Sequence, residues 1–161
     1  MSEKRTEISE LGEFGLIDQL AKGAHLKNPS TLKGIGDDAA VLDSGDLVTV
    51  VSTDLLLEGV HFDLSYTPLP HLGFKAVAVN VSDIAAMNAI PTQSTVSIAL
   101  SNRFSVEAVN ALYEGIYAAC ERKLASNPLI SSLLIEMAKP ELSHFPSFCQ
   151  TNLITGMPAI R

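Results

Sequence analysis

Acidic side chains recur in three short motifs: Gly34-Ile-Gly-Asp-Asp38, Ser52-Thr-Asp54 and Asn80-Val-Ser-Asp83. Few Lys or Arg lie close to Asp38, Asp54 and Asp83 in the sequence. Carboxylates that converge without basic partners are most easily explained by divalent cations. Mg²⁺ takes one or two carboxylates and completes its octahedron with waters and phosphate oxygens. Together the three motifs predict a Mg²⁺ site that serves phosphoryl transfer.

Each motif alone has a simpler interpretation. Paired Asp after Gly is typical of a solvated turn. Asp54 could cap the segment that follows it, and Asn80 and Asp83, three residues apart, could share the solvent-facing side of a helix. The glycines at 34 and 36 do not belong to a nucleotide P-loop, because no Gly-Lys-Ser/Thr follows them. The alternating acidic spacing of an EF-hand is also missing. The Mg²⁺ interpretation therefore depends on all three motifs.

Hydrophobic periodicity predicts the elements that must position these motifs. The β-branched run 47–54 is almost continuously apolar, which predicts a strand buried on both faces and ending in Ser-Thr-Asp. The third motif falls inside a predicted helix over 71–87. The expected elements are helix 13–22, strands 39–42 and 47–54, helix 71–87, strand 95–100 and helix 105–121. This α-β-β-α-β-α order predicts an α/β fold with a mixed sheet packed with helices.

Charge and hydropathy exclude several classes of protein. The net charge of −7 argues against nucleic acid as a partner, because phosphate neutralisation needs clustered Lys and Arg. No apolar run approaches the roughly 20 residues of a membrane-spanning helix, so no membrane partner is expected. Charged residues at the start are not followed by an apolar stretch, so no secretory signal is expected. Cys120 and Cys149 then indicate reduced thiols in a cytoplasmic protein.

The composition changes near residue 122. A length of 161 residues suggests one domain. However, residues 1–122 hold 16 of the 18 Asp and Glu and all the Asp, whereas residues 123–161 hold 3 Lys or Arg and 2 Glu. We therefore expect residues 1–122 to form an N-terminal ATP- and Mg²⁺-binding domain. Residues 123–161 are expected to be a divergent tail, non-native or disordered. A short helix is expected over 129–138, and residues 140–161 show no clear period.

Four motifs in order make the sequence similar to a known family. Gly34–Asp38, Ser52–Asp54, Gly59-Val-His-Phe62 and the run from Lys75 to Met87 resemble the N-terminal half of the thiamine-monophosphate kinases. The resemblance covers residues 13–122. It also places the sequence in the wider superfamily of aminoimidazole ribonucleotide synthetase. The fold implied is the N-terminal domain of that superfamily, with the C-terminal domain absent.

This resemblance implies an activity and a set of site residues. The activity is ATP-dependent phosphorylation of thiamine monophosphate to thiamine diphosphate, with Mg²⁺, in a homodimer that pairs through its N-terminal domains. No catalytic side chain is assigned, because catalysis would be electrostatic. His61 matches a position that contacts the substrate phosphate, and Tyr113 matches a position near ATP. The positions that match metal ligands are Asp38, Ser52, Thr53, Asp54 and Asp83.

The resemblance ends after Arg122. There the family continues with Gly-Gly-Asp-Thr-Thr, whose Asp is a further ligand, and this sequence has no such segment. We expect residues 123–161 to be out-of-frame translation of a truncated gene, and the chain to be weakly active or inactive. Two alternatives stay open. The chain could be a non-catalytic fragment, or it could be another ATP-dependent synthetase of the superfamily, of the selenophosphate or aminoimidazole ribonucleotide type.

Overall fold

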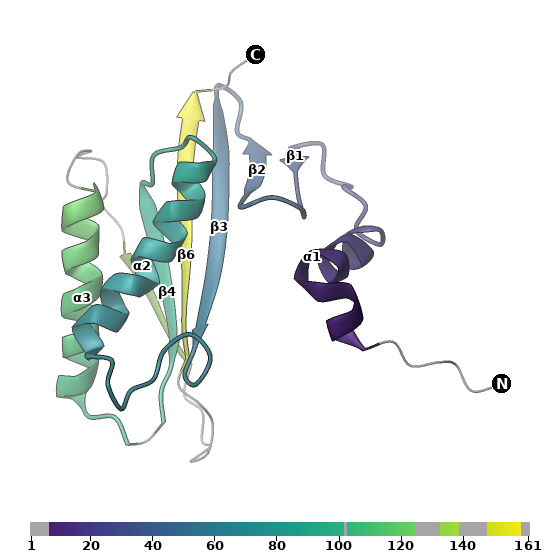
Figure 1. Ribbon diagram of the computed structural model, residues 1–161. Coiled ribbons are helices and arrows are strands. Elements are labelled where there is room, and N and C mark those ends of the chain that lie inside the picture. The colour runs from purple at the N-terminus through teal and green to yellow at the C-terminus, as the bar shows by residue number, and fades with distance from the viewer. Residues whose placement is uncertain (1–6, 102, 125–132, 139–147, 159–161) are drawn as a thin grey trace.

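A six-stranded sheet carries two long helices on one face (Figure 1). The computed structural model describes residues 7–101, 103–124, 133–138 and 148–158. Of residues 122–124, 133–138 and 148–158 it describes the main chain only. The elements are α1 Ile8–Ala21, β1 Thr31–Lys33, β2 Ala40–Asp43, β3 Leu47–Leu57, α2 Leu69–Ala86, β4 Gln93–Ala99, α3 Val106–Leu124, β5 Leu133–Ala138 and β6 Phe148–Pro158.

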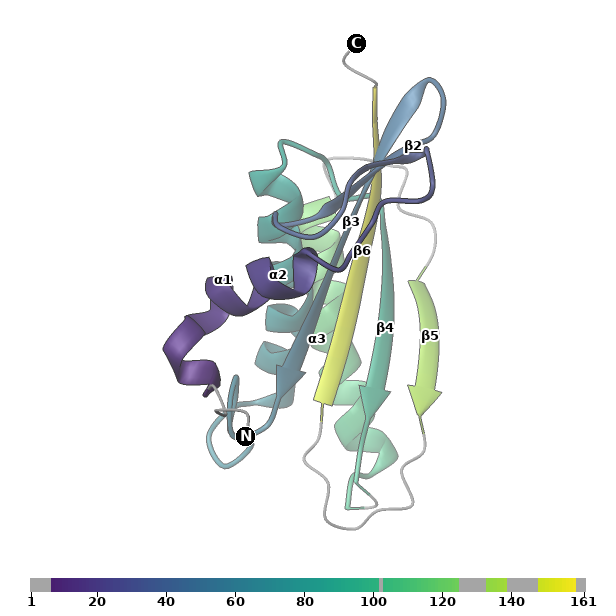
Figure 2. The same cartoon turned by 90° about the vertical axis from the view of Figure 1, so that its right-hand side faces the viewer.

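The strand order is β1-β2-β3-β6-β4-β5. Strands β4 and β5 run parallel, and every other neighbouring pair is antiparallel. The sheet is therefore mixed and packed with helices, which confirms the expected α/β class. Strand β6 lies between β3 and β4, so the two strands that carry the central core positions are joined through it (Figure 2).

All six expected elements are present, with boundaries shifted by a few residues. Ser105 caps α3 as its position suggests, because its Oγ accepts a hydrogen bond from the main-chain N–H of Ala108 at 3.2 Å. Strands β1, β5 and β6 were not expected. The helix expected over 129–138 is wrong for Leu133–Ala138, which form β5, and residues 129–132 lie outside the described residues. Strand β6 falls in the segment that lacks a clear sequence period.

Burial along β3 alternates, so the expectation that both its faces are buried is wrong. Val50, Ser52 and Leu56 are buried on the face that α2 covers, whereas Leu47 and Leu55 on the other face are 47% and 44% exposed. Successive side chains of a strand point to opposite faces. The apolar residues of this run are thus packed on one face of the strand, and the other face of the strand is open.

Helices α2 and α3 pack closely because each presents a glycine at the crossing. A Cβ atom on Gly73 would lie 2.0 Å from the carbonyl oxygen of Leu112, and one on Gly115 would lie 1.8 Å from that of Pro70. These contacts leave no room for a methyl group on either helix. The main core cluster lies beneath this pair and includes Leu56, Phe62, Leu72, Ala76, Val77, Val96, Ile98, Leu112, Tyr113, Ile116 and Ala119.

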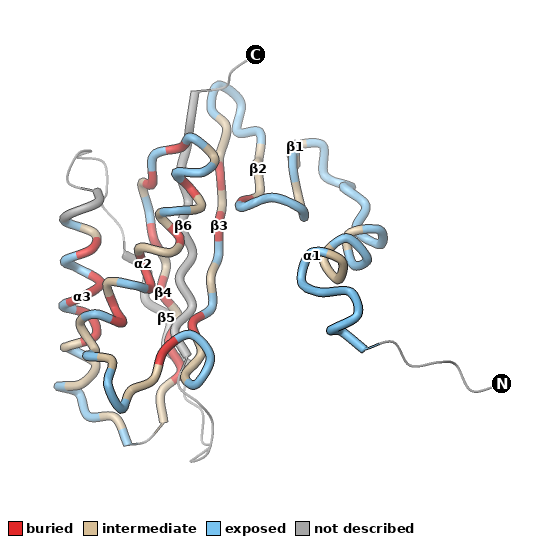
Figure 3. Tube along the Cα trace, in the orientation of Figure 1, coloured by how far each residue is buried: buried red, intermediate tan, exposed pale blue. Residues whose placement is uncertain are grey.

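Helix α1 lies away from this core (Figures 1 and 3). None of its residues is buried, and Phe14, part of its expected apolar stripe, is 80% exposed. The helix is interrupted at Gly12, whose φ of 67° belongs to the left-handed region that glycine tolerates without strain. Apolar periodicity thus correctly predicts a helix here. Among the described residues, however, no other element buries the apolar side chains of α1.

Candidate functional site

Strand β3 and helix α2 bring two of the three acidic motifs together. The Oγ of Ser52 donates a hydrogen bond of 2.7 Å to Oδ2 of Asp83, although the two residues are 31 positions apart. Ser52 is 3% exposed. Asp54, two residues further along β3, faces the same side and is partly buried. The site therefore has a buried hydroxyl and a carboxyl group on β3, and a second carboxyl group on α2.

Asp54 has a raised pKa. Burial is the largest cause, followed by the charge of Asp83 and a side-chain hydrogen bond with Asp83. The nearby His61 acts in the opposite direction and lowers this pKa. A carboxyl group that is both partly desolvated and beside a like charge gains most from a cation. The pair therefore has the electrostatics of a cation site.

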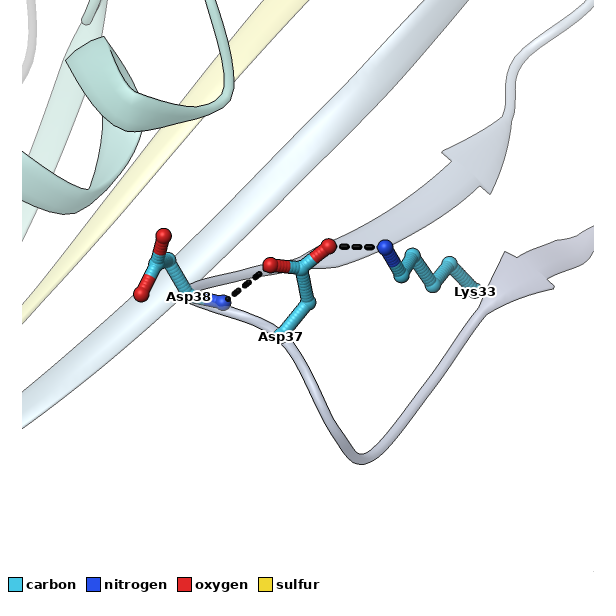
Figure 4. A network of polar contacts seen from close by, with 3 residues as sticks. All are labelled: Lys33, Asp37 and Asp38. Carbon is cyan, nitrogen blue, oxygen red and sulfur yellow. Dashed lines mark hydrogen bonds and ion pairs between the residues drawn. The ribbon is translucent and has the colours of Figure 1, made fainter.

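The first acidic motif lies in the loop between β1 and β2. Lys33 forms an ion pair with Asp37, and Asp37 also accepts a hydrogen bond of 3.0 Å from the main-chain N–H of Asp38 (Figure 4). The carboxyl group of Asp38 points away from Lys33 (Figure 4). Ala40, two residues later, pairs with Val51. The loop therefore approaches β3 just before the Ser52–Asp54 segment, with Asp37 neutralised and Asp38 left exposed.

Strand alternation separates Thr53 from its two neighbours. The side chains of Ser52 and Asp54 face α2, so that of Thr53 faces the other side of the sheet, where it is exposed. Among the described residues, no group of three or more His, Cys, Asp or Glu is arranged to hold a metal ion. The structure thus brings Asp54 and Asp83 together with Ser52, and it does not add Asp38 to that pair as a third acidic ligand.

The donors that do meet fit Mg²⁺. Two carboxylates and a hydroxyl are hard oxygen ligands, and Mg²⁺ commonly takes one or two protein carboxylates and leaves other positions to water and phosphate. Burial and then the charge of Asp83 raise the pKa of Asp54, and a cation would favour its ionised form against both. Asp54 and Asp83 are therefore the residues best placed to hold such an ion.

Asn80 is fully buried, so a solvent-facing helix side is the wrong interpretation for this residue. Its Nδ2 donates to the carbonyl oxygen of Ala76 at 3.2 Å, but within the described part of the chain its Oδ1 has no hydrogen-bond partner. Ser94 of β4, 3% exposed, has a similarly unpartnered Oγ. Ser52 and Ser94 are both in register with Leu153. Sequence reasoning missed Ser94, because no local motif marks it.

His61 lies in the turn that follows β3. Its ring is exposed, and Nδ1 accepts a hydrogen bond of 3.0 Å from the main-chain N–H of Leu57. The charge of His61 has a small lowering effect on the pKa of Asp54, which burial and Asp83 raise.

Tyr113 lies on α3 and is only 9% exposed, within the main core cluster. Its ring centroid is 5.9 Å from that of Tyr117, at an angle of 54°. The side chain therefore contributes packing between the helices. Its expected place near ATP stays a prediction.

A hollow of about 540 Å³ lies between α1 and the β1–β2 loop. Phe14, Ile17 and Ile35 contribute apolar residues to its lining, and four acidic residues also line it. The acidic residues are Glu13, Asp18, Asp37 and Asp38. Sequence reasoning did not find this feature, because its two sides come from separate elements.

The fold and these motifs match one protein family. The sequence profile of the family "AIR synthase related protein, N-terminal domain" matches residues 36–141, and the chain belongs to this family. The matched range runs beyond residue 122, where the resemblance was expected to end. Whether residues 123–161 are a foreign tail stays a prediction.

Within this family the chain is similar to thiamine-monophosphate kinases. It is 40% identical over 114 residues to the enzyme of Aquifex aeolicus, a match that covers 71% of this chain and 35% of the relative. It is 39% identical over 116 residues to that of Mycobacterium tuberculosis, covering 71% of this chain and 34% of the relative. The chain thus spans about a third of the length of these curated relatives.

A solved structure described as AaThiL complexed with AMPPCP and TMP has the same fold. It aligns with a TM-score of 0.73 and 30% sequence identity, over 96% of this chain and 45% of that one. The thiamine monophosphate kinase of Aquifex aeolicus aligns with a TM-score of 0.64 and 27% identity, over 93% of this chain and 44% of that one. The alignments confirm the expected N-terminal-domain fold.

Proposed function

We propose that this chain belongs to an ATP-dependent thiamine-monophosphate kinase. The observation that carries the proposal is the Ser52–Asp83 hydrogen bond with Asp54 beside it. These are the residues through which the sequence resembles that family. Similarity to the kinases of Aquifex aeolicus and Mycobacterium tuberculosis supports the same activity. In the reaction, a phosphate oxygen of thiamine monophosphate bonds to the γ-phosphorus of ATP, the bond to the β-phosphate oxygen breaks, and ADP leaves.

The chain's own residues have two tasks in this proposal. Asp54 and Asp83 would hold Mg²⁺, which supplies positive charge to the phosphate chains when bound. Ser52 fixes the orientation of Asp83 through its hydrogen bond. The acceptor is already a phosphate oxygen, so no strong general base is needed and positioning provides most of the catalysis. On the resemblance alone, we propose Asp38 and Thr53 as further metal ligands and Tyr113 as an ATP contact.

The partners proposed are thiamine monophosphate, ATP and a second copy of the chain. Within the described residues, no helix is long and apolar enough to cross a membrane. A cytoplasmic location is proposed separately, from the two cysteines and the similarity to the kinases. Cys120 is a free thiol.

A second candidate is a chain that binds Mg²⁺ and phosphate but does not turn over. It is favoured by the lack of any Gly-Gly-Asp-Thr-Thr segment in the sequence, where the resemblance implies a further acidic ligand. In this second candidate Asp54 and Asp83 would still hold Mg²⁺, but the acidic ligand of that segment would be lacking.

A coupled assay of ADP release with thiamine monophosphate separates the two candidates. The Aquifex aeolicus relative serves as the positive control under the same conditions. Turnover by this chain that disappears in Asp54→Asn would support the kinase. No turnover by the chain, while the control is active, would support the non-catalytic candidate. ATP consumption with a substrate of the selenophosphate or aminoimidazole ribonucleotide synthetases, but not with thiamine monophosphate, would contradict both and indicate a synthetase.

A further inference from the structure

One polar side chain interrupts the buried stripe of α2. Val77, Asn80 and Ile84 are all fully buried, at the spacing of three and four residues that places them on one side of the helix. Val77 belongs to the main core cluster, and Ile84 belongs to a second cluster with Val50 of β3. Asn80 therefore lies between two apolar contacts, on the side of the helix that faces the sheet. An amide in such a place is unfavourable unless its donors and acceptors are paired.

The Asn80 amide is paired at its nitrogen but not at its oxygen. Nδ2 donates to the carbonyl oxygen of Ala76 at 3.2 Å, and this contact fixes which end of the amide is the nitrogen. Oδ1 has no hydrogen-bond partner among the residues that the structure describes. The large majority of buried side-chain polar atoms in proteins have such a partner, either a protein group or an ordered water. The oxygen of Asn80 therefore calls for a donor.

Ser94 of β4 lies on the face of the sheet that α2 covers. Ser52 and Ser94 are both in register with Leu153 of β6, and directly opposed residues of antiparallel strands point to the same face. Ser52 bonds to Asp83 of α2, which identifies that face. One strand separates the two serines, so they lie about 10 Å apart, roughly the width of one helix. Within the described residues the Oγ of Ser94, which is 3% exposed, also has no hydrogen-bond partner.

A water molecule has the hydrogen-bonding capacity that these two atoms need. The amide oxygen of Asn80 can only accept, whereas the hydroxyl of Ser94 can donate or accept. The two atoms do not bond to each other. Water can donate to the amide oxygen and bond to the hydroxyl in either direction. Internal waters make about three hydrogen bonds to buried polar groups, and the Oγ of Ser52, which donates to Asp83, keeps acceptor capacity on the same face.

We propose that Asn80 and Ser94 bind an internal water molecule between α2 and β4, and that they are thereby positioning residues for Asp83. Asp83 lies one helical turn after Asn80, and Ser52 links it to β3. The water links the preceding turn of α2 to β4. Two directional links to strands on either side of β6 resist rotation of the helix, which non-directional apolar contacts do not. The water site stands without the proposed function, whereas the positioning role rests on the Mg²⁺ site proposed there.

The direction of the stability change in Ser94→Ala tests the water site. An unpaired buried hydroxyl is unfavourable, so its removal would raise the midpoint of urea unfolding. A hydroxyl that binds water supports the Asn80 oxygen, so we expect its removal to lower the midpoint. Ser97→Ala, the same change at a half-buried position on the other face of β4, is the matched control and should change little. A midpoint for Ser94→Ala at or above that of the unmodified chain would overturn the proposal.

A double-mutant cycle tests whether one water serves both residues. Asn80→Leu removes the amide oxygen at similar volume. If Asn80 and Ser94 share a water, the loss in the double variant is smaller than the sum of the two single losses. Ser97→Ala should be additive with Asn80→Leu. Additive losses for Asn80→Leu and Ser94→Ala would overturn the shared site.

A crystal structure of the unmodified chain decides the water site even if Asn80→Leu does not fold. We expect density for one water within about 3 Å of both Asn80 Oδ1 and Ser94 Oγ. Protein donors or acceptors at these two atoms, in place of a water, would overturn the proposal.

Mg²⁺ titration tests the positioning role and separates it from the proposed function. Ser94→Ala should need about tenfold more Mg²⁺ for the same rise in the unfolding midpoint, as is typical when support of a metal ligand is lost. Lost packing alone would lower the midpoint at every Mg²⁺ concentration and leave the rise unchanged. Ser97→Ala should respond as the unmodified chain does.

An unchanged Mg²⁺ response in Ser94→Ala would overturn the positioning role and leave both the water site and the proposed function standing. An unmodified chain without any Mg²⁺ response would contradict the proposed metal site and the positioning role together. The crystal structure and the double-mutant cycle would then still decide the water site, because neither depends on a metal ion.

Discussion

At the scale of single residues, the site holds two like charges close together. The charge of Asp83 acts on Asp54, and Ser52 donates a hydrogen bond to Asp83. Such an arrangement costs folding stability when both groups are ionised, because burial and mutual repulsion both act against charge. Pairs of this kind are common at functional sites, where a bound cation offsets the repulsion.

The raised pKa of Asp54 predicts a pH-dependent gain in stability for Asp54→Asn. Below the ordinary value of 3.8 the carboxyl group is protonated in both folded and unfolded chains, so it makes no difference. As the pH rises, the unfolded chain ionises first and the free energy of unfolding falls. Near neutral pH, Asp54→Asn should therefore unfold with a free energy about 0.5 kcal/mol higher than the unmodified chain, a size typical of partly exposed charges.

Urea unfolding of both proteins across this pH range measures the difference. The gain should vanish in acid. A variant that is less stable than the unmodified chain near neutral pH would show that the Asp54 carboxylate makes a favourable contact instead.

Mg²⁺ should stabilise the unmodified chain, because an ion that binds only the folded state raises the unfolding midpoint with its concentration. Asp54→Asn should lose most of this dependence, since it removes one of two carboxylates. Glu114→Gln, an exposed change of the same type on α3, is the matched control and should keep the full dependence. Equal Mg²⁺ dependence in all three proteins would argue against a metal site at Asp54.

At the scale of elements, the α2–α3 pair determines where the Asp83 helix lies. Gly73 and Gly115 allow main chain to contact main chain at the crossing. Neither glycine is marked by the apolar periodicity that predicts the two helices. Periodicity describes which face of a helix is buried, whereas the distance between two helices depends on the side chains at their contact.

Gly115→Ala should destabilise the fold strongly. The added Cβ would lie 1.8 Å from the Pro70 carbonyl oxygen, so the helices must separate. Overpacking of this kind costs about 3 kcal/mol or more, and loss of the α2 position should also weaken Mg²⁺ binding. Gly15→Ala in α1, where the nearest atom is 3.4 Å away, is the control and should change little. Urea unfolding curves measure both, and equal stabilities would contradict the close crossing.

At the scale of the whole molecule, one face of the sheet carries α2 and α3, while β3 leaves its other face open in the described residues. Exposed apolar positions on β3, such as Leu47 and Leu55, are what a partner surface would cover. A stable protein–protein contact buries about 800 Å² on each partner. This face is where the proposed pairing of two N-terminal domains would place its contact.

Leu55→Asp should therefore shift the chain from dimer to monomer. The carboxylate would lose its hydration in the contact without gaining a partner. Val106→Asp is the control, because it introduces the same charge at a position 72% exposed at the start of α3. Sedimentation velocity measures both variants. A monomeric unmodified chain, or a dimer that survives Leu55→Asp, would contradict pairing through this face.

Sequence alone determined the acidic motifs, the periodic helices and the central strand, because residue type and spacing are local properties. It therefore predicted the α/β class and named Ser52, Asp54 and Asp83. It could not determine which strand face each residue occupies. Because the β3 segment is almost continuously apolar, its sequence did not show that burial alternates along the strand. The sequence also did not predict strands β1, β5 and β6. Short or aperiodic strands form where neighbouring strands supply hydrogen bonds, and the sequence does not show which strands are neighbours.

Tertiary structure decided which motifs meet. The Ser52–Asp83 contact joins residues 31 apart, and only the packing of α2 on the sheet creates it. The same packing buries Asn80, whereas Asp38 stays on a separate loop. Long-range contacts depend on how whole elements pack, so no local pattern in the sequence contains them.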